Sequence, residues 1–246
     1  MPLVLSPEKA VPPMEPTLNN PFRRSVVKGL LGTTSFWMAS GNARWAEALA
    51  AEAAQPYRPV FFDAAEYQFL ESACERLFPA DHNGPGARAL GVAEFLDRQM
   101  QTPYARGENW YMSGPFEQGP ANLGYQLPFV PKDLYRKGIA GVEHYARQQY
   151  GKGFAALSAM QQDEILTALE GGSVQLGDIP GRVFFEQLRT NTLEGAFADP
   201  LYGGNRGLGG WVMLGFPGAR ADFMDWVNQE GASYPIGPVS ISGETA

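Results

Sequence analysis

The chain is organised around residues 199–218, which read DPLYGGNRGLGGWVMLGFPG in a sequence that is otherwise helical in its periodicity. Seven of these twenty residues are glycine, and a glycine costs about 1 kcal/mol relative to alanine inside a helix. This glycine-rich stretch is therefore predicted to be a loop. Its shape is set by glycines that permit a positive φ and close approach to another surface: Gly203, Gly204, Gly207, Gly209 and Gly210.

Three large amphipathic side chains, Tyr202, Arg206 and Trp211, lie between or beside these glycines. Side chains of these types dominate protein contacts when they enter a pocket. Two roles stay open for the glycine-rich stretch: a brace that folds back on the chain's own core, or a surface shaped for a partner. A phosphate-binding loop is disfavoured, because GGNRGLGG lacks the G-x-x-x-x-G-K-[ST] pattern and no strand precedes it.

Apolar residues recur at helical spacing on both sides of the glycine-rich stretch. Two of the expected helices begin at capping boxes, Asp63 with Glu66 and Ser158 with Gln161. No segment alternates apolar and polar residues over a useful length, so strands are not expected. The sequence thus predicts an all-α fold, a small domain of five or six helices with long loops rich in glycine, proline and aromatic residues. The expected helices cover residues 63–78, 92–102, 132–150, 158–170, 183–197 and 219–229.

The last two expected helices adjoin the glycine-rich stretch. In the helix before it, Leu193 and Phe197 are among the residues expected to point inward. In the helix after it, Phe223, Trp226 and Val227 have the spacing of an apolar helix face. The chain after residue 230 is rich in proline, glycine and serine and is expected to be an extended tail.

Composition limits the function. With 44% hydrophobic and 18% charged residues the chain is typical of a globular protein, and its net charge of −7 disfavours nucleic acid and acidic substrates as partners. The single cysteine, Cys74, excludes an intrachain disulfide, a C-x-x-C-H haem attachment and an iron–sulfur cluster. Cys74 lies on an apolar helix face and is predicted to be an inert core thiol. His82 and His144 lack the spacing and supporting ligands of a usual metal or haem site.

Residues 103–131 have neither helical nor strand periodicity and are rich in aromatic residues and proline. A structureless stretch of this length inside a compact domain is commonly functional or interfacial. Its aromatic side chains, Trp110 and Tyr111 among them, make it too apolar for a flexible linker. We expect it to lie against the core or against a partner, and both remain open.

A polar turn at residues 79–91 carries Asp81 and His82, and Glu94 follows on the next helix. Carboxylates and imidazole can act as acid–base groups or metal ligands, which would make the chain an exported enzyme in its own right. The plainer interpretation of Asp81 and His82 is a polar loop tip between helices. A third hypothesis is an exported ligand-binding module that uses the glycine-rich stretch.

Residues 1–55 are predicted to be an export signal and linker. Arg23, Arg24 and Lys28 precede a modestly apolar run at residues 29–39, an order that resembles the twin-arginine signal. The apolar run is far short of the roughly 20 residues that cross a bilayer. The twin-arginine translocase carries proteins that are already folded, with a cofactor or a bound partner. Because no cofactor motif is visible, the sequence favours a bound partner and a periplasmic location.

Two further blocks carry a family resemblance, LFPADHNGPGARALGVAEFLD at residues 77–97 and NTLEGAFADPLYGGNRGLGGWVMLGFPG at residues 191–218. Together with the leader, they resemble the gluconate 2-dehydrogenase subunit 3 family, the small gamma subunit of membrane-bound sugar and polyol dehydrogenases. The resemblance covers about residues 20–230. It implies one helical subunit 3 domain over residues 56–230, with the extended tail at 231–246.

The resemblance implies a subunit without a cofactor of its own. Its partners would be a large FAD-dependent dehydrogenase subunit and a multihaem cytochrome c subunit, which carry the FAD and the haem c. The chain would escort the large subunit through folded export, stabilise it, and reach the membrane only through the complex. No residue of this chain would then be catalytic, hold a cofactor or bind a metal.

Residue by residue, Arg23 and Arg24 would be the export-recognition pair, although Val26 and Val27 stand where Phe-Leu is commoner. The positions that match the family signature, as partner interface or as structural elements, are Asp199, Pro200, Tyr202, Gly203, Gly204, Asn205, Trp211, Phe216, Pro217 and Gly218. Arg206, Trp110 and Tyr111 join them as candidate interface residues.

Overall fold

A computed structural model describes residues 57–246 apart from 118 and 233. These residues form six α-helices, short 3₁₀ turns and one hairpin of two-residue strands, which confirms the all-α prediction. None of the described helices is both long and apolar enough to span a membrane. The predicted leader, with Arg23, Arg24 and Lys28, lies outside the described residues.

The helices follow one another along the chain, and the hairpin separates α6 from α7. The α-helices are α3 (Ala64–Leu77), α4 (Val92–Gln99), α5 (Pro131–Tyr150), α6 (Ala159–Glu170), α7 (Gly181–Phe197) and α8 (Gly209–Leu214). In the hairpin, β1 (Gln175–Leu176) pairs antiparallel with β2 (Ile179–Pro180), with Leu176 opposite Ile179. The 3₁₀ turns are η1 (Pro103–Arg106), η2 (Ala121–Leu123), η3 (Phe154–Ala156), η4 (Pro200–Tyr202), η5 (Arg206–Leu208) and η6 (Met224–Trp226).

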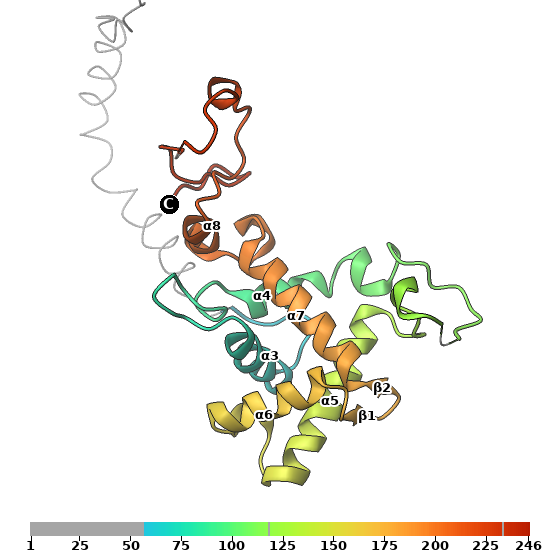
Figure 1. The fold of residues 1–246 in the computed structure, drawn as a ribbon. Coiled ribbons are helices and arrows are strands. Elements are labelled where there is room, and N and C mark those ends of the chain that lie inside the picture. Colours follow the sequence, from blue (N-terminus) through green and yellow to red (C-terminus); the bar gives the residue numbers. More distant parts are fainter. Residues whose placement is uncertain (1–56, 118, 233) are drawn as a thin grey trace, which may run out of the picture. The chain divides into compact units, whose positions relative to one another are not determined.

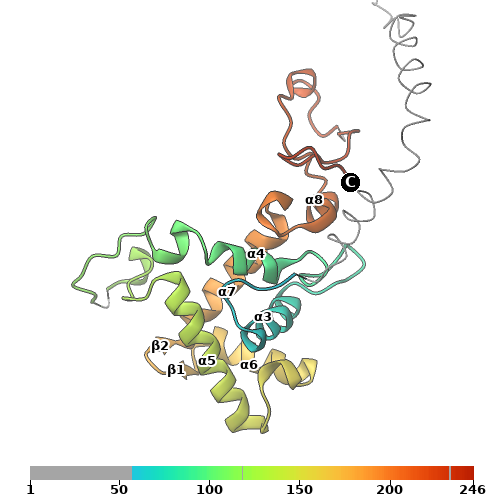
Figure 2. The same cartoon turned by 180° about the vertical axis from the view of Figure 1, so that it is seen from behind.

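Helix α7 runs through the middle of the helices, from the hairpin at one end to α8 at the other (Figures 1 and 2). Its Phe184 packs on Tyr135 of α5 and Phe69 of α3, with ring centroids 5.9 and 6.3 Å apart. Gly138 lets α5 approach this closely, because a Cβ there would lie 2.2 Å from the Phe184 ring. The core is therefore aromatic and is centred on the helix that leads into the glycine-rich stretch.

The two capping boxes set the starts of α3 and α6 as predicted. The Asp63 carboxylate accepts from Glu66 N at 2.9 Å, and Glu66 accepts from Asp63 N at 3.0 Å. Ser158 and Gln161 make the corresponding contacts at the start of α6. Each box satisfies backbone N–H groups that have no partner inside the helix.

The first described residues are fixed to α4 by Asp97, a contact that the sequence did not predict. The buried Asp97 carboxylate accepts from the backbone N–H groups of Val60 at 2.7 Å, Phe61 at 3.0 Å and Phe62 at 2.8 Å. It also accepts from the Tyr57 hydroxyl at 2.7 Å. Partial burial and this hydrogen bond raise the pKa of Tyr57 well above its usual range. One side chain thus anchors the segment that enters the domain.

Two expectations beside the glycine-rich stretch are wrong. Residues 219–229 do not form a helix, and only η6 is helical there. Phe223 and Trp226 pack instead on Tyr234, and Val227 is exposed. The expected apolar face therefore does not pack on the helical core, and a short helix without such packing is marginal. Leu193 is 43% exposed on α7, whereas its neighbours Asn191 and Thr192 are buried.

The glycine-rich stretch is also not a loop throughout. Gly209 and Gly210 begin α8, and Gly209 has a helical φ of −58°. The left-handed backbone falls instead at four other glycines, Gly203, Gly207, Gly215 and Gly218. It also occurs at two residues that are not glycine, Asn205 with φ 46° and Leu208 with φ 58°. Close packing of Gly210 against α7 compensates for the low helix propensity of these glycines.

Candidate functional site

The glycine-rich stretch closes the carboxyl end of α7. The last carbonyl groups of a helix have no partner inside it. Here Asn205 N donates to the Gly195 oxygen at 3.0 Å, and the Trp211 indole Nε1 donates to the Phe197 oxygen at 2.8 Å. The Asn205 amide Nδ2 donates to the Ala198 oxygen at 2.9 Å. The stretch therefore forms an extended cap on the central helix.

Two glycines are required because the cap lies directly on the α7 backbone. A Cβ at Gly204 would lie 2.1 Å from the Gly195 oxygen, and one at Gly210 would lie 2.2 Å from the Ala196 oxygen. Both distances are shorter than any Cβ contact that a folded protein tolerates. The absence of a side chain at these positions is thus a packing requirement of the cap.

Arg206 joins this cap to α4. Its guanidinium pairs with the Glu94 carboxylate, which also pairs with Arg98 one turn further along α4. The Arg206 backbone N–H donates to the Leu90 oxygen at 3.1 Å, just before the helix begins. The Glu94 side chain is 9% exposed, so its charge is balanced by two arginines rather than by water. Glu94 is consequently an ion-pair residue that fixes the cap.

Asp199 joins the cap to the tail. Its carboxylate accepts from Leu201 N at 3.0 Å, which caps η4, and from Ile241 N at 2.7 Å. Asp199 is buried, as are Gly203 and Gly204. Most of the signature positions therefore hold the chain's own fold together.

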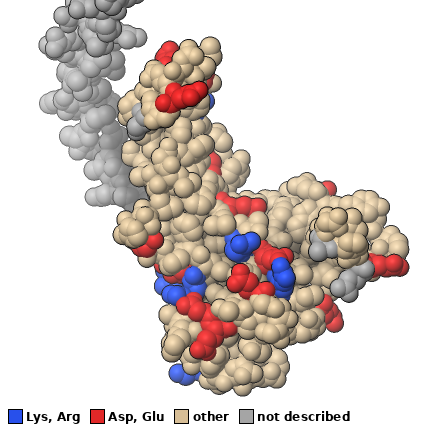
Figure 3. Space-filling view, viewed as in Figure 1, with Lys and Arg blue, Asp and Glu red and all other residues tan. Residues whose placement is uncertain are grey.

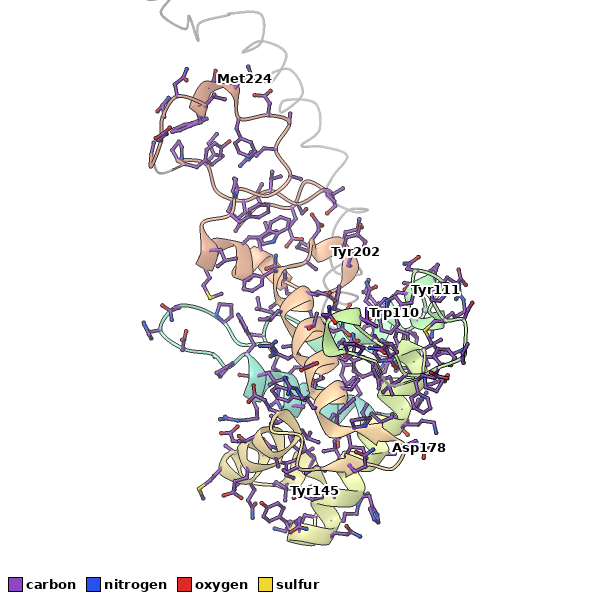
Figure 4. The ribbon with its side chains drawn as sticks, turned by 45° about the vertical axis from the view of Figure 1, so that its right-hand side comes forward. Trp110, Tyr111, Tyr145, Asp178, Tyr202 and Met224 are labelled. Carbon is purple, nitrogen blue, oxygen red and sulfur yellow. The ribbon has the colours of Figure 1, made fainter. Side chains whose placement is uncertain are left out.

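The outer side of the cap is apolar and exposed. Tyr202 and Phe216 are each about half exposed, and Figure 4 places Tyr202 on the outside of the ribbon. Phe216 contacts the buried Trp211 edge to face, with ring centroids 5.0 Å apart. The other exposed apolar residues of the cap are Leu201, Val212 and Leu214. The cap, whose backbone is held to α7 by hydrogen bonds, thus presents apolar side chains to the solvent.

A family model, gluconate 2-dehydrogenase subunit 3, matches residues 64–218. The chain belongs to the gluconate 2-dehydrogenase subunit 3 family. The match begins at the first residue of α3 and ends at the last residue of the glycine-rich stretch, so it includes α7 and its cap. No curated protein and no solved structure matches the chain. The family is named for a subunit of a dehydrogenase, which makes this chain a component of such a complex.

Within this family domain, the aromatic segment at residues 103–131 forms a separate feature. Trp110 packs between Tyr104 and Tyr125, with ring centroids 5.9 and 4.8 Å away. Burial raises the pKa of Tyr104 to about 12. Tyr111, the next residue, is 88% exposed. The two neighbouring candidates therefore differ: Trp110 is packed within the domain, and Tyr111 is exposed to the solvent.

The exposed part of this segment is hollowed. A cavity of about 430 Å³ is lined by Trp110, Tyr111, Met112, Ser113, Pro115, Phe116, Glu117, Leu123, Tyr125 and Gln126. Its lining is mainly aromatic and aliphatic, with one carboxylate. The segment thus offers a second apolar surface on the subunit 3 domain, formed by other elements than the α7 cap.

The residues of the catalytic alternative have their own local partners in the described part of the chain. Asp81 is exposed and accepts from the Asn83 backbone at 2.8 Å and from the Asn83 side chain at 2.9 Å, and these bonds lower the pKa of Asp81. His82 is exposed beside it, while Glu94 is held between arginines. Across residues 57–246, apart from the two that are not described, no group of three or more His, Cys, Asp or Glu side chains could hold a metal ion.

Sequence reasoning missed the left-handed backbone of Leu208 and the ion pair between Glu94 and Arg206. The left-handed Leu208 has no sequence signal, because leucine is not a residue that favours this backbone region. Asn205 does have a signal, since asparagine tolerates the left-handed region and here follows two glycines. The ion pair joins residues 112 positions apart, and no local pattern reports such a contact.

Proposed function

We propose that this chain is the non-catalytic small subunit of a periplasmic, membrane-bound, FAD-dependent dehydrogenase complex that oxidises a sugar, a sugar acid or a polyol. In this proposal the chain escorts the large flavoprotein subunit through the twin-arginine translocase and stabilises it. FAD and haem c belong to the flavoprotein and to a multihaem cytochrome c subunit, through which the complex reaches the membrane. No residue of this chain takes part in the oxidation.

Membership of the gluconate 2-dehydrogenase subunit 3 family is the observation that carries this proposal. The α7 cap supports it, because the cap holds Tyr202 and Phe216 outward on a fixed backbone. A subunit that binds only the folded form of its partner stabilises that form by mass action. The escort and stabilising roles therefore need nothing more than a rigid surface that recognises the folded flavoprotein.

Affinity purification of the full-length chain from native membranes tests the complex. We expect flavin and c-type haem absorption in the eluate, together with acceptor-dependent oxidation of a sugar, sugar acid or polyol. The chain purified alone is expected to be inactive. A chain that turns over substrate unaided, or one that recovers no flavin from its own membranes, would contradict the proposal.

A second experiment tests the escort role. Arg23→Lys combined with Arg24→Lys removes the paired arginines while it retains the charge. We expect the flavoprotein subunit to disappear from the periplasm and its dehydrogenase activity to fall with it. Arg58→Lys, outside the leader, is the matched control and is expected to have no effect on export. A flavoprotein that still reaches the periplasm in normal amount would refute the escort role.

A further inference from the structure

A projecting loop follows the α7 cap, and we call residues 219–239, without the undescribed residue 233, the arm. Its two ends are tied together, because Ala219 N donates to the Val239 oxygen at 2.7 Å and Val239 N donates to the Pro217 oxygen at 3.3 Å. Figure 1 shows the arm projecting beyond α8, and Figure 4 places Met224 at its far end. The arm is thus a closed loop on a fixed base.

The arm keeps its shape through its own aromatic side chains. Tyr234 lies 5.6 Å from the Phe223 ring and 5.4 Å from the Trp226 ring, measured between centroids. The Arg220 guanidinium lies over the Tyr234 ring at 5.7 Å. These contacts order the arm before any partner arrives, so binding through it would lose little conformational entropy.

Although its aromatic residues pack internally, the arm exposes its aliphatic ones. Met224 is 74% exposed at the tip, and Val227 and Ile236 are also exposed. Figure 3 shows the arm as mostly uncharged surface with acidic atoms at its far end. An ordered loop that displays apolar side chains on several sides is a binding element, because monomeric proteins rarely keep such surface in water.

The charges of the arm determine what kind of partner it fits. It contains one basic residue, Arg220, against three acidic ones, Asp222, Asp225 and Glu230, and no lysine, which gives a net charge of −2. Elements that bind membrane surfaces combine apolar side chains with lysine and arginine, since lipid headgroups carry negative charge. The arm has the opposite charge. It therefore fits a protein groove that is apolar inside and lined with lysine and arginine at its rim.

We propose that the arm docks into such an apolar groove with a basic rim on the flavoprotein subunit. This inference rests on the proposed function, which supplies the flavoprotein as the partner. The arm begins directly after residue 218, where the family match ends. It is therefore an element outside the matched domain on which the choice between flavoprotein partners can depend.

The test is a pair of exposed substitutions in the full-length chain, co-expressed with its flavoprotein. Met224→Ser with Val227→Ser removes two aliphatic tips and disturbs none of the aromatic contacts. Met160→Ser on α6 is the matched control, because Met160 is 70% exposed and lies outside the arm. We expect the FAD that copurifies per mole of chain to fall about tenfold or more for the arm variant. The control is expected to recover the wild-type amount, and both unfolding midpoints are expected to match that of the wild type.

Two outcomes would overturn the arm proposal. If the wild-type chain and the arm variant recover equal FAD, the arm does not dock, while the proposed function stands. If the wild-type chain sediments with vesicles of phosphatidylcholine and phosphatidylglycerol and the arm variant does not, the arm binds lipid instead. Failure of the proposed function itself gives a different result, because the wild-type chain would then recover no FAD at all.

Discussion

The indole Nε1 of Trp211 donates a hydrogen bond of 2.8 Å to the carbonyl oxygen of Phe197, the last residue of α7. Trp211 is buried, and its ring packs edge to face against the exposed Phe216. A tryptophan in a glycine-rich loop would ordinarily be considered a contact for a partner. Here it fixes the end of the central helix, and Tyr202 and Phe216 are the aromatic residues of the cap that remain exposed.

Substitution of Trp211 and Tyr202 should separate these two roles. Trp211→Ala removes a buried ring and the hydrogen bond to Phe197, and we expect it to cost about 3–5 kcal/mol of unfolding free energy. Tyr202→Ala should cost less than about 1 kcal/mol, because its ring is half exposed. Urea unfolding of the isolated chain measures both. Equal losses would show that the cap does not depend on the indole.

The glycines of the cap should differ in their tolerance of a methyl group. Gly204→Ala places a Cβ 2.1 Å from the Gly195 oxygen, and we expect it to cost about 3 kcal/mol or more. Gly207→Ala is the control, because Gly207 also lies in the stretch but has open space around it. Its positive φ of 62° should cost only about 1 kcal/mol. Thermal unfolding of the two variants ranks them, and the reverse order would refute the close packing of the cap.

Asn205 combines a left-handed backbone with two side-chain hydrogen bonds, to the Ala198 oxygen and from the Gly210 N–H. Asn205→Ala loses both bonds and adds backbone strain, so we expect a loss of about 3 kcal/mol. Asn205→Gly loses the same bonds without the strain and should be about 1 kcal/mol more stable than the alanine variant. Chemical denaturation measures this difference. An alanine variant as stable as the glycine variant would contradict a backbone contribution at this position.

The parts of the fold that could be predicted from the sequence are those set by local chemistry. Each capping box joins residues only three positions apart, Asp63 with Glu66 and Ser158 with Gln161. The predicted starts of α3 and α6 are both confirmed. The core position of Cys74 follows from its helix face and is also confirmed. By contrast, residues 219–229 have the apolar spacing of a helix but do not form one. Periodicity alone does not say whether the apolar face of such a helix would pack on the core.

The sequence directs attention to residues 199–218 but does not give their geometry. The glycines could not show that Gly204 and Gly210 lie on the α7 backbone. The pairing of Arg206 with Glu94 and the anchoring of residues 60–62 by Asp97 depend on tertiary geometry. Long-range polar contacts of this kind leave no periodic pattern in a single sequence.

Asp97 should control how firmly the chain's entry segment is held. Asp97→Ala removes the acceptor of three backbone N–H groups and of the Tyr57 hydroxyl, and we expect a loss of more than about 2 kcal/mol. Limited proteolysis should then cut near residues 57–62 much faster than in the wild type. Asp178→Asn is the control, because Asp178 is exposed and makes only a 3.5 Å ion pair with Lys137. Unchanged proteolysis in the Asp97 variant would show that the anchor is dispensable.

Cys74 should make the stability of the domain depend on alkaline pH. Burial raises the pKa of the Cys74 thiol from 9.0 to about 12, and Thr192 Oγ1 lies 3.3 Å from its sulfur. The unfolded chain therefore loses this proton at lower pH than the folded chain. The thiol's contribution to stability is complete below about pH 9 and is lost as the pH rises to about 12.

Cys74→Ala removes this dependence and leaves that of the buried tyrosines, including Tyr104, unchanged. We expect the unfolding free energies of the wild type and the variant to converge between pH 9 and pH 11. Parallel curves, or a native thiol that reacts readily with a thiol reagent at pH 8, would contradict the burial of Cys74.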